Sequence, residues 1–462
     1  MAAFGATKTG NDAKRLKHLC ILCRYARSKL RLLRSRRGVL FSSQQSCRTV
    51  LLVPAAQFTS VMSIMSGDEL PDELKPFKPH LSPRFFEMRQ RVVNFIFSVI
   101  QPAKPIYRDQ LKANQDAAVA AGLHPLQAKE PAIVDELRAQ AKAHGLYNFF
   151  LPAVSGLTVL EYAPIAEILG IFRLANQAMN CSAPDTGNME VLEQFGTPQQ
   201  KSRWLDPLLE GKIRSCFAMT EPGVASSDAS QISSRIEESS DGHNYIINGH
   251  KWYISGAMRP ECKVAVFLGK TSFDGPKHRR QSMILVPMDS AGIKILRPMA
   301  VFGHEHDHAE IIFDNVVVPK ENMILGPGRG FDIAQARLGP GRIHHCMRTI
   351  GLAEAALAAM VHRAHNRTAF GSVLAEKDTI RQVIARARIE ITKCRSLCYL
   401  AAFMADSVGF KRARKYISMI KIEAPRMALQ VVDEAIQMHG AHGVSQDSNL
   451  AAIYTGTVLS RT

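Results

Sequence analysis

The hydrophobic period changes twice along this chain, from helical to extended and back to helical. Between residues 85 and 212, apolar residues recur three and four positions apart, as at Val134, Leu137 and Ala141. Residues 213–320 instead hold short β-branched runs, and two apolar stripes with helical steps follow them. This order predicts an α+β fold, in which a small β-domain lies between two helical domains and the last of these is a bundle.

The stripes and the β-branched runs set the boundaries that we expect. The stripes are Ile380, Val383, Ile384, Ala387, Ile391 and Cys394, followed by Ile417, Ile420, Ala424, Met427, Val431, Ala435 and Met438. Within the extended region, Asn248-Gly249 predicts a hairpin turn. The expected segments are a basic leader at 1–66, a Pro-rich linker at 67–84, an N-terminal helical domain at 85–212, a β-domain at 213–325 and a C-terminal helical domain at 326–462.

The positive charge is concentrated at the beginning of the chain. The net charge is +17, and residues 1–67 hold twelve Lys and Arg against one acid, Asp12. Arg24, Arg27, Arg31 and Arg34 recur at helical spacing beside a Leu-rich face, which is typical of a mitochondrial presequence. We therefore expect a mitochondrial rather than a peroxisomal location, since the last three residues do not match a peroxisomal signal. A disordered arm and a nucleic-acid-binding arm are alternatives for this leader.

The cysteines and the longest apolar run do not indicate another class of protein. Nine cysteines scattered along a large chain speak against a secreted disulfide framework. Cys20-x-x-Cys23 resembles half of a metal or redox site, but no second pair stands nearby and the pair lies in the leader, so we expect no site there. The apolar run from Val50 to Met65 is interrupted by Pro54 and is too short to span a bilayer.

Three separated motifs carry a resemblance to a known enzyme family. Residues 217–228 read FAMTEPGVASSD, residues 251–255 read KWYIS, and residues 437–447 read QMHGAHGVSQD. In this order they resemble the first signature, the flavin-facing strand and the second signature of the acyl-CoA dehydrogenases. YNFFLPAVSGL and RLGPGRIHHCMRTIGLAE further resemble the subgroup of family members ten and eleven, without the kinase-like domain that such relatives often carry.

The resemblance implies an acyl-CoA dehydrogenase-like fold with FAD as the cofactor. A flavin ring needs backbone donors and hydroxyls, and its diphosphate needs N–H groups and cations. Small residues at 223–227 allow backbone N–H groups to approach a ligand closely. The implied cofactor contacts are Phe217, Ala218, Met219, Thr220, Glu221, Pro222, Gly223, Val224, Ala225, Ser226, Ser227, Tyr253, Ile254, Ser255, Arg367, Gln437, Gly440 and Ala441. Ser255 would lie near the flavin N5, and the last four residues would reach the cofactor of a neighbouring subunit.

The resemblance also implies a substrate and partners. Gly339-Pro340-Gly341-Arg342 resembles a loop that holds the CoA side of an acyl chain, and Ser227 would face both ligands. The implied reaction converts an acyl-CoA thioester to the trans-2-enoyl-CoA, as in fatty acid β-oxidation, and passes electrons to an electron-transfer flavoprotein. We expect a homodimer or homotetramer with no metal and no nucleic-acid partner, while membrane association stays open.

The catalytic base of the family has no counterpart in this sequence. The reaction needs a carboxylate to remove the α-proton, which most members place farther along than the twenty-five residues that follow Gln437. Tyr454-Thr455-Gly456-Thr457 resembles the family's Tyr-Glu-Gly-Thr but holds Thr in place of the acid. We therefore expect a C-terminal domain truncated from about Thr455, exposed apolar faces near 380–410 and 417–438, and low solubility. The alternative function is an FAD- or acyl-CoA-binding form that partners full-length subunits without turnover.

Two further patterns have a chemical and a structural interpretation. His304, His306 and His308 alternate along the chain and could hold a metal on one strand face, but a solvated loop is the favoured interpretation. Gly326-Pro-Gly-Arg-Gly330 could bind phosphate, but it follows no Rossmann strand. For this segment we expect a glycine turn before a helix.

Overall fold

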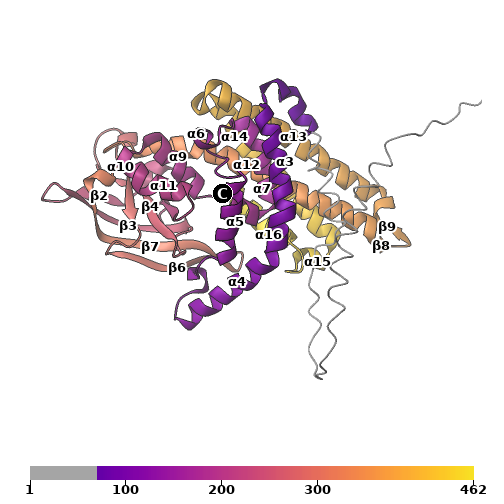
Figure 1. Ribbon diagram of the computed structural model, residues 1–462, viewed down its shortest axis with the longest axis horizontal. Helices are drawn as coiled ribbons and strands as arrows, with labels where there is room; N and C mark the ends of the chain where they lie inside the picture. The colour runs from indigo at the N-terminus through magenta and orange to yellow at the C-terminus, as the bar shows by residue number, and fades with distance from the viewer. Residues whose placement is uncertain (1–69, 462) are drawn as a thin grey trace, which may run out of the picture. The chain divides into compact units, whose positions relative to one another are not determined.

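The computed structural model describes residues 70–461, which belong to one unit of the chain that begins at Val53. Helices, a sheet and a second set of helices follow one another (Figure 1), which confirms the predicted α–β–α order. The predicted leader and its three cysteines, Cys20, Cys23 and Cys47, lie outside the described residues. Among the described helices, none is both long enough and apolar enough to cross a membrane.

The N-terminal helices surround a helix that is buried on all sides. Nearly every residue of α7 (Val159–Ile171) is buried, as expected for a helix without a polar face. Asp406 caps its first turn by accepting hydrogen bonds from the backbone N–H groups of Val159 and Leu160, at 2.9 and 2.8 Å. The other elements of this part are η1 (Asp72–His80), α3 (Pro83–Phe95), η2 (Ile96–Ile100), α4 (Gln101–Ala120), η3 (Pro125–Gln127), α5 (Ala132–Ala143), α6 (Pro152–Ser155), α8 (Arg173–Ala178), α9 (Asp185–Phe195), α10 (Pro198–Gln200), η4 (Lys201–Leu205) and α11 (Asp206–Leu209).

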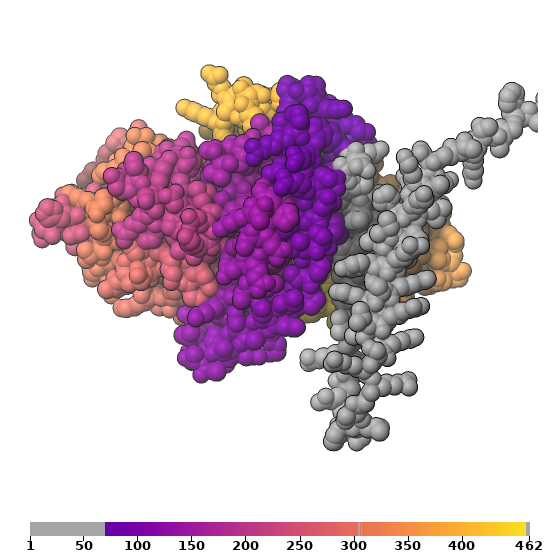
Figure 2. All heavy atoms as spheres, in the orientation of Figure 1, coloured from indigo at the N-terminus to yellow at the C-terminus, as the bar shows by residue number. Residues whose placement is uncertain are grey.

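The β-domain is a mixed seven-stranded sheet. Its strands are β1 (Arg214–Ala218), β2 (Arg235–Glu238), β3 (Asn244–Ser255), β4 (Cys262–Lys270), β5 (Gln281–Pro287), β6 (Ile293–Val301) and β7 (His304–Pro319), with short helices η5 (Ala229–Gln231), η6 (Lys277–Arg279) and η7 (Lys320–Asn322). The order is β1-β4-β2-β3-β7-β6, and β5 also pairs with β4. Gln200 donates to the carbonyls of Glu321 and Met323, at 2.7 and 3.0 Å, and so joins the N-terminal helices to this domain. The two parts border each other in the space-filling view (Figure 2).

Two local predictions in the sheet are wrong. Asn248-Gly249 does not form a hairpin turn, because β3 runs through it with a bulge. A Cβ on Gly249 would lie 2.2 Å from the Ser234 hydroxyl, so close packing, not a turn, requires this glycine. Residues 304–308 do not form a loop, since they open β7 and pair with β6 and β3. The side chains of His304 and His306 lie outside the described ones.

Three long helices dominate the C-terminal part. They are α12 (Gly330–Asn366), α13 (Asp378–Val408) and α14 (Phe410–His439), accompanied by β8 (Thr368–Ala369), β9 (Ser372–Val373), η8 (Leu374–Glu376), α15 (Ala441–Val444) and α16 (Leu450–Arg461). Gly326 and Gly328 have positive φ angles just before α12, which confirms the predicted glycine turn. Helix α12 packs on α7, α13, α14 and α16.

The apolar stripes of the C-terminal helices are not left exposed, contrary to the prediction. Ala387, Ile391 and Cys394 of the first stripe are buried, and so is the second stripe up to Ala435. Helices α7, α12 and α16 cover them within the same chain. Within the predicted linker, η1 buries Leu74 completely.

A buried arginine joins helices that precede the sheet in the sequence to helices that follow it. Arg395 of α13 is 4% exposed and forms ion pairs with Glu73, Glu167 and Glu354, at 3.1, 2.6 and 2.5 Å. These carboxylates come from η1, α7 and α12. They raise the pKa of Arg395 although its burial opposes the charge. One side chain therefore holds four segments together.

We expect Arg395→Met to lower the thermal stability strongly. Removing the guanidinium leaves buried carboxylates without their cation, which costs about 3–5 kcal/mol. Thermal unfolding followed by circular dichroism measures the effect. Arg381→Met, which removes an exposed cation paired with Asp378 on the same helix, is the matched control. Equal melting temperatures for the two variants would contradict this role.

Candidate functional site

Two of the predicted segments meet at the end of β1. The Thr220 hydroxyl donates to the Trp252 carbonyl, and the Trp252 N–H donates to the Thr220 carbonyl at 3.1 Å. The turn that follows β1 therefore lies directly beside the second half of β3. This arrangement brings Thr220 and the KWYIS strand, which are about thirty positions apart in the sequence, to one place.

A buried ion pair fixes the turn. Lys251 is completely buried, and its Nζ donates to Glu221 Oε1 at 2.7 Å and to the carbonyls of Met219 and Leu268 at 3.0 and 2.7 Å. The Glu221 carboxylate also accepts hydrogen bonds from the backbone N–H and the hydroxyl of both Ser233 and Ser234. All three Lys251 donors are thus satisfied, as a buried ammonium requires.

The pKa of Glu221 follows from this environment. Burial by itself raises the pKa, but the Lys251 charge and the hydrogen bonds from Lys251, Ser233 and Ser234 outweigh it and lower the pKa of Glu221 to about 2. Burial lowers the pKa of Lys251 to about 8, and the Glu221 charge opposes that change. Both groups are therefore charged at neutral pH, and the pair is an ion pair.

The backbone is strained at Tyr253, next to this ion pair. Tyr253 has φ 53°, a value that a non-glycine residue rarely adopts, at a break in the pairing of β3 with β7. Tyr253 is 45% exposed, and its ring packs edge-on against Trp252, with 5.1 Å between ring centroids. Ile254 points into the core of the β-domain, whereas Ser255 is half-buried. Strain that the surrounding structure maintains is a common mark of a functional site.

The turn itself offers the surface that a flat ligand needs. Gly223, Ala225 and Ser227 are exposed, and a Cβ on Gly223 would meet no atom within 4 Å. The side chains of Ala218 and Glu221 point into the core, so only their backbone atoms are available to a ligand. Pro222, Val224 and Ser226 are half-buried. The open turn of small residues, the hydroxyls of Thr220 and Ser255, and the exposed ring of Tyr253 together fit an isoalloxazine ring.

A second contact joins the end of β1 to α12. The Arg337 guanidinium stacks on the Phe217 ring, 3.9 Å from its centroid, and donates to Asn188 at 3.1 Å. The predicted substrate residues Gly339, Pro340, Gly341 and Arg342 follow Arg337 within α12 and are half-exposed. They therefore do not form a loop, and the prediction of one is wrong, because the helix continues through Pro340.

Sequence reasoning missed a polar cluster behind Arg337. Burial raises the pKa of Glu190 to about 8, against the opposing charges of Arg337 and Arg348. Burial and Arg348 lower the pKa of His344 to about 3, and its Nδ1 lies 3.8 Å from Glu190. Within residues 70–461, Glu190 Oε2, His344 Nδ1 and Arg348 Nη1 have no hydrogen-bond partner. The only signal was that Glu190 lies between the apolar residues Met189 and Val191 of α9.

The remaining predicted cofactor residues lie elsewhere. Arg367 follows the last residue of α12, a 37-residue helix about 55 Å long whose first residue packs on Ser282 of β5. Gln437, Gly440 and Ala441 are exposed at the end of α14, where the charge of Arg363, near the end of α12, acts on His439. Phe370, at the tip of the β8–β9 hairpin, is 97% exposed. In one chain these residues do not meet the turn after β1.

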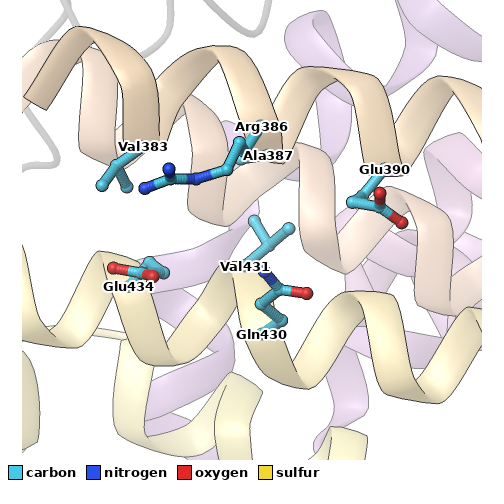
Figure 3. Close-up of a pocket in the computed structure, with 7 residues that line it drawn as sticks. All are labelled: Val383, Arg386, Ala387, Glu390, Gln430, Val431 and Glu434. Atoms are coloured by element: carbon cyan, nitrogen blue, oxygen red, sulfur yellow. The ribbon is translucent and has the colours of Figure 1, made fainter. Parts of the chain in front are cut away.

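Three other features do not add to the site. Thr457 is buried inside α16, where its hydroxyl donates to the Ile453 carbonyl at 2.7 Å. A cavity of about 10 Å³ between α13 and α14, ringed by Arg386, Glu390, Gln430 and Glu434 (Figure 3), holds at most one water. Among the described residues, no group of three or more His, Cys, Asp or Glu is placed to hold a metal.

A larger cleft of about 380 Å³ opens beside the turn. It is lined by Glu221, Pro222 and Gly223 and, across from them, by Ser233, Ser234, Arg235, Asn248, Gly249 and His250. It shares only three residues with the predicted site and includes none of Thr220, Ser227, Tyr253 or Ser255.

We expect Glu221→Gln to reduce both the stability and its acid dependence. The pKa of Glu221 is about 4.5 in the unfolded chain and about 2 in the folded one. Its stabilising contribution, about 3 kcal/mol, is therefore complete above pH 4.5 and is lost as the pH falls toward 2. Melting temperatures between pH 7 and pH 3 measure this loss, with Glu237→Gln on the exposed face of β2 as the control. The same acid dependence in wild type and Glu221→Gln would refute the assignment.

Comparison with known proteins identifies the family. Models of the N-terminal, middle and C-terminal domains of acyl-CoA dehydrogenase match residues 105–212, 216–316 and 328–461. FadE2 of Mycobacterium tuberculosis is 51% identical over 377 residues, which are 81% of this chain and 90% of that protein. Acyl-CoA dehydrogenase family member 10 of Mus musculus is 51% identical over 385 residues, 81% of this chain, but the match spans only 35% of the mouse protein.

Solved structures agree with this assignment. A structure from Mycobacterium abscessus, assigned to the acyl-CoA dehydrogenases, is 44% identical with a TM-score of 0.76, over 82% of this chain and 94% of that one. Proteins of this fold have been solved with FAD and with FADH2. The predicted fold, family and cofactor are thereby confirmed. With all three domains present in order, this chain belongs to the acyl-CoA dehydrogenases and is an FAD-dependent oxidoreductase.

Proposed function

We propose that the protein oxidises an acyl-CoA thioester to the trans-2-enoyl-CoA and passes the electrons to an electron-transfer flavoprotein. The observation that carries this proposal is the convergence of the Thr220 turn and the Tyr253–Ser255 strand, which the Glu221–Lys251 ion pair holds together. Bound FAD supplies a hydride acceptor at this place. The half-buried hydroxyls of Thr220 and Ser255 orient it, and the exposed glycine turn admits its flat ring.

The position of Arg367 and Gln437 supports a homo-oligomer. Arg367 follows the end of α12 that is about 55 Å from the β-domain, and Gln437 lies near that end, in α14, so they cannot serve the flavin of their own chain. Large apolar side chains on α13 and α14, Ile389 and Ile422, are more than half exposed. A second copy that covers Ile389 and Ile422 would bring Arg367 to its partner's cofactor. We also propose a mitochondrial location, on the basis of the basic leader.

The CoA phosphates would bind at a basic loop. Lys277-His278-Arg279-Arg280 follows β4, and Lys277 reaches Asp228 at the end of the turn, at 3.2 Å. His278 stacks on Phe331 at the beginning of α12, with 4.2 Å between ring centroids. The loop therefore places exposed cations between the turn and α12, where a phosphorylated substrate arm would emerge.

We expect Lys277→Ala combined with Arg279→Ala to raise the KM for acyl-CoA at least tenfold, because each charged hydrogen bond contributes about 1.5–3 kcal/mol. The same variant should bind acyl-pantetheine, which lacks the nucleotide phosphates, as the wild type does. Lys294→Ala, which removes an exposed cation on β6, is the control. Equal losses with both thioesters would contradict phosphate recognition by this loop.

A second candidate function is binding without turnover. It is favoured by Thr455, which holds the place of the acid in the Tyr-Glu-Gly-Thr pattern and whose hydroxyl donates to the Ala452 carbonyl of α16 at 3.1 Å. Such a form would hold FAD or acyl-CoA, or would partner full-length subunits.

Anaerobic titration of the FAD-loaded protein with acyl-CoA thioesters of increasing length separates the two functions. We expect loss of the visible flavin absorbance and formation of the enoyl-CoA. Bound flavin that stays oxidised with every thioester would instead support binding without turnover. A protein that remains colourless after reconstitution with FAD would contradict turnover and any role that requires bound FAD.

A further inference from the structure

We propose that His308 is a positioning residue that determines where the Ser255 hydroxyl proton points, and thereby the redox potential of the bound flavin. The proposal rests on the proposed placement of the flavin against Ser255. The Ser255 hydroxyl and His308 Nδ1 are 2.8 Å apart, a hydrogen-bond distance. Both side chains are half-buried, so the pair lies at the edge of the protein interior.

The sheet holds this pair in register. Ser255 and His308 are direct partners on the antiparallel strands β3 and β7. The neighbouring residues form a further bond between the two segments, because the Gly256 N–H donates to the Asp307 carbonyl at 2.8 Å. Arg259 then binds the Asp307 carboxylate with two hydrogen bonds, at 2.9 and 2.6 Å. The strand register and these bonds therefore hold the His308 imidazole beside the Ser255 hydroxyl.

The imidazole limits what the hydroxyl can do. A serine hydroxyl has one proton to donate and lone pairs that accept. When neutral His308 accepts that proton at Nδ1, the Ser255 oxygen presents only lone pairs to a neighbouring ligand. A flavin N5 is a hydrogen-bond acceptor when oxidised and carries a proton to donate when reduced. A hydroxyl held as an acceptor consequently favours the reduced cofactor.

The expected effect is a lower midpoint potential in His308→Ala. Without its partner the hydroxyl rotates and donates to the oxidised cofactor, which shifts the ratio of reduced to oxidised flavin about tenfold. For a two-electron couple this corresponds to about 30 mV. His308→Asn should retain most of the wild-type potential, because an amide oxygen accepts in place of Nδ1. The potential is measured by dye-coupled reduction of the FAD-loaded protein, without substrate.

Two comparisons isolate the pair. In the Ser255→Ala background, His308→Ala should have no further effect on the potential, as in a double-mutant cycle with complete coupling. His250→Ala, which breaks a matched contact of 2.8 Å with Glu310 on β7, should leave the potential unchanged. A potential that is unchanged or raised in His308→Ala, or an effect that persists without Ser255, overturns the proposal.

The readout is separate from that of the proposed function. Absence of FAD from the wild type would contradict the function itself. If acyl-CoA reduces the bound flavin but the midpoint potential is the same in wild type and His308→Ala, only this inference is contradicted. If Ser255→Ala alone left the potential and the flavin spectrum unchanged, the ring would not lie against Ser255, and the inference would fail with that placement.

Discussion

The buried ion pair between Lys251 and Glu221 is the contact on which the site depends. Burying either charge alone would cost several kcal/mol, so each is retained only because the other is present. The pair joins the turn after β1 to β3 and, through the Leu268 carbonyl, to β4. Because its hydrogen bonds are satisfied within the protein, the turn keeps its shape with its small residues facing outward. The surface for the flavin is therefore prepared before the cofactor arrives.

Polar contacts also set the position of the site among the domains. Asp406 caps α7, Arg395 gathers three carboxylates from separate elements, and Arg337 stacks on Phe217. Each contact joins helices of one part to a different part of the chain. The apolar cores alone would allow these parts to slide, because hydrophobic packing has no direction. Directional contacts fix the end of β1 against α12, where substrate and cofactor must meet.

The sequence predicted the order of the elements well, because hydrophobic period follows directly from which face is buried. Prediction from the sequence failed where one residue type occurs in two kinds of structure, as glycine does in turns and in closely packed strands. Gly249 looked like a turn residue, yet it admits the Ser234 hydroxyl inside a continuous strand. Pro340 looked like part of a loop, yet α12 continues through it. Contacts between distant segments, such as His308 with Ser255 or Glu190 with His344, leave no local pattern and could not be read from the chain.

The proposed binding mode places the flavin ring against Thr220 and Ser255 and its diphosphate at Arg367 of a second copy. A crystal structure of the FAD-loaded protein tests it most directly. We expect both hydroxyls within hydrogen-bond distance of the ring, and two chains around each cofactor. A ring bound in the cleft between Gly223 and His250, or a cofactor held by one chain alone, would contradict it.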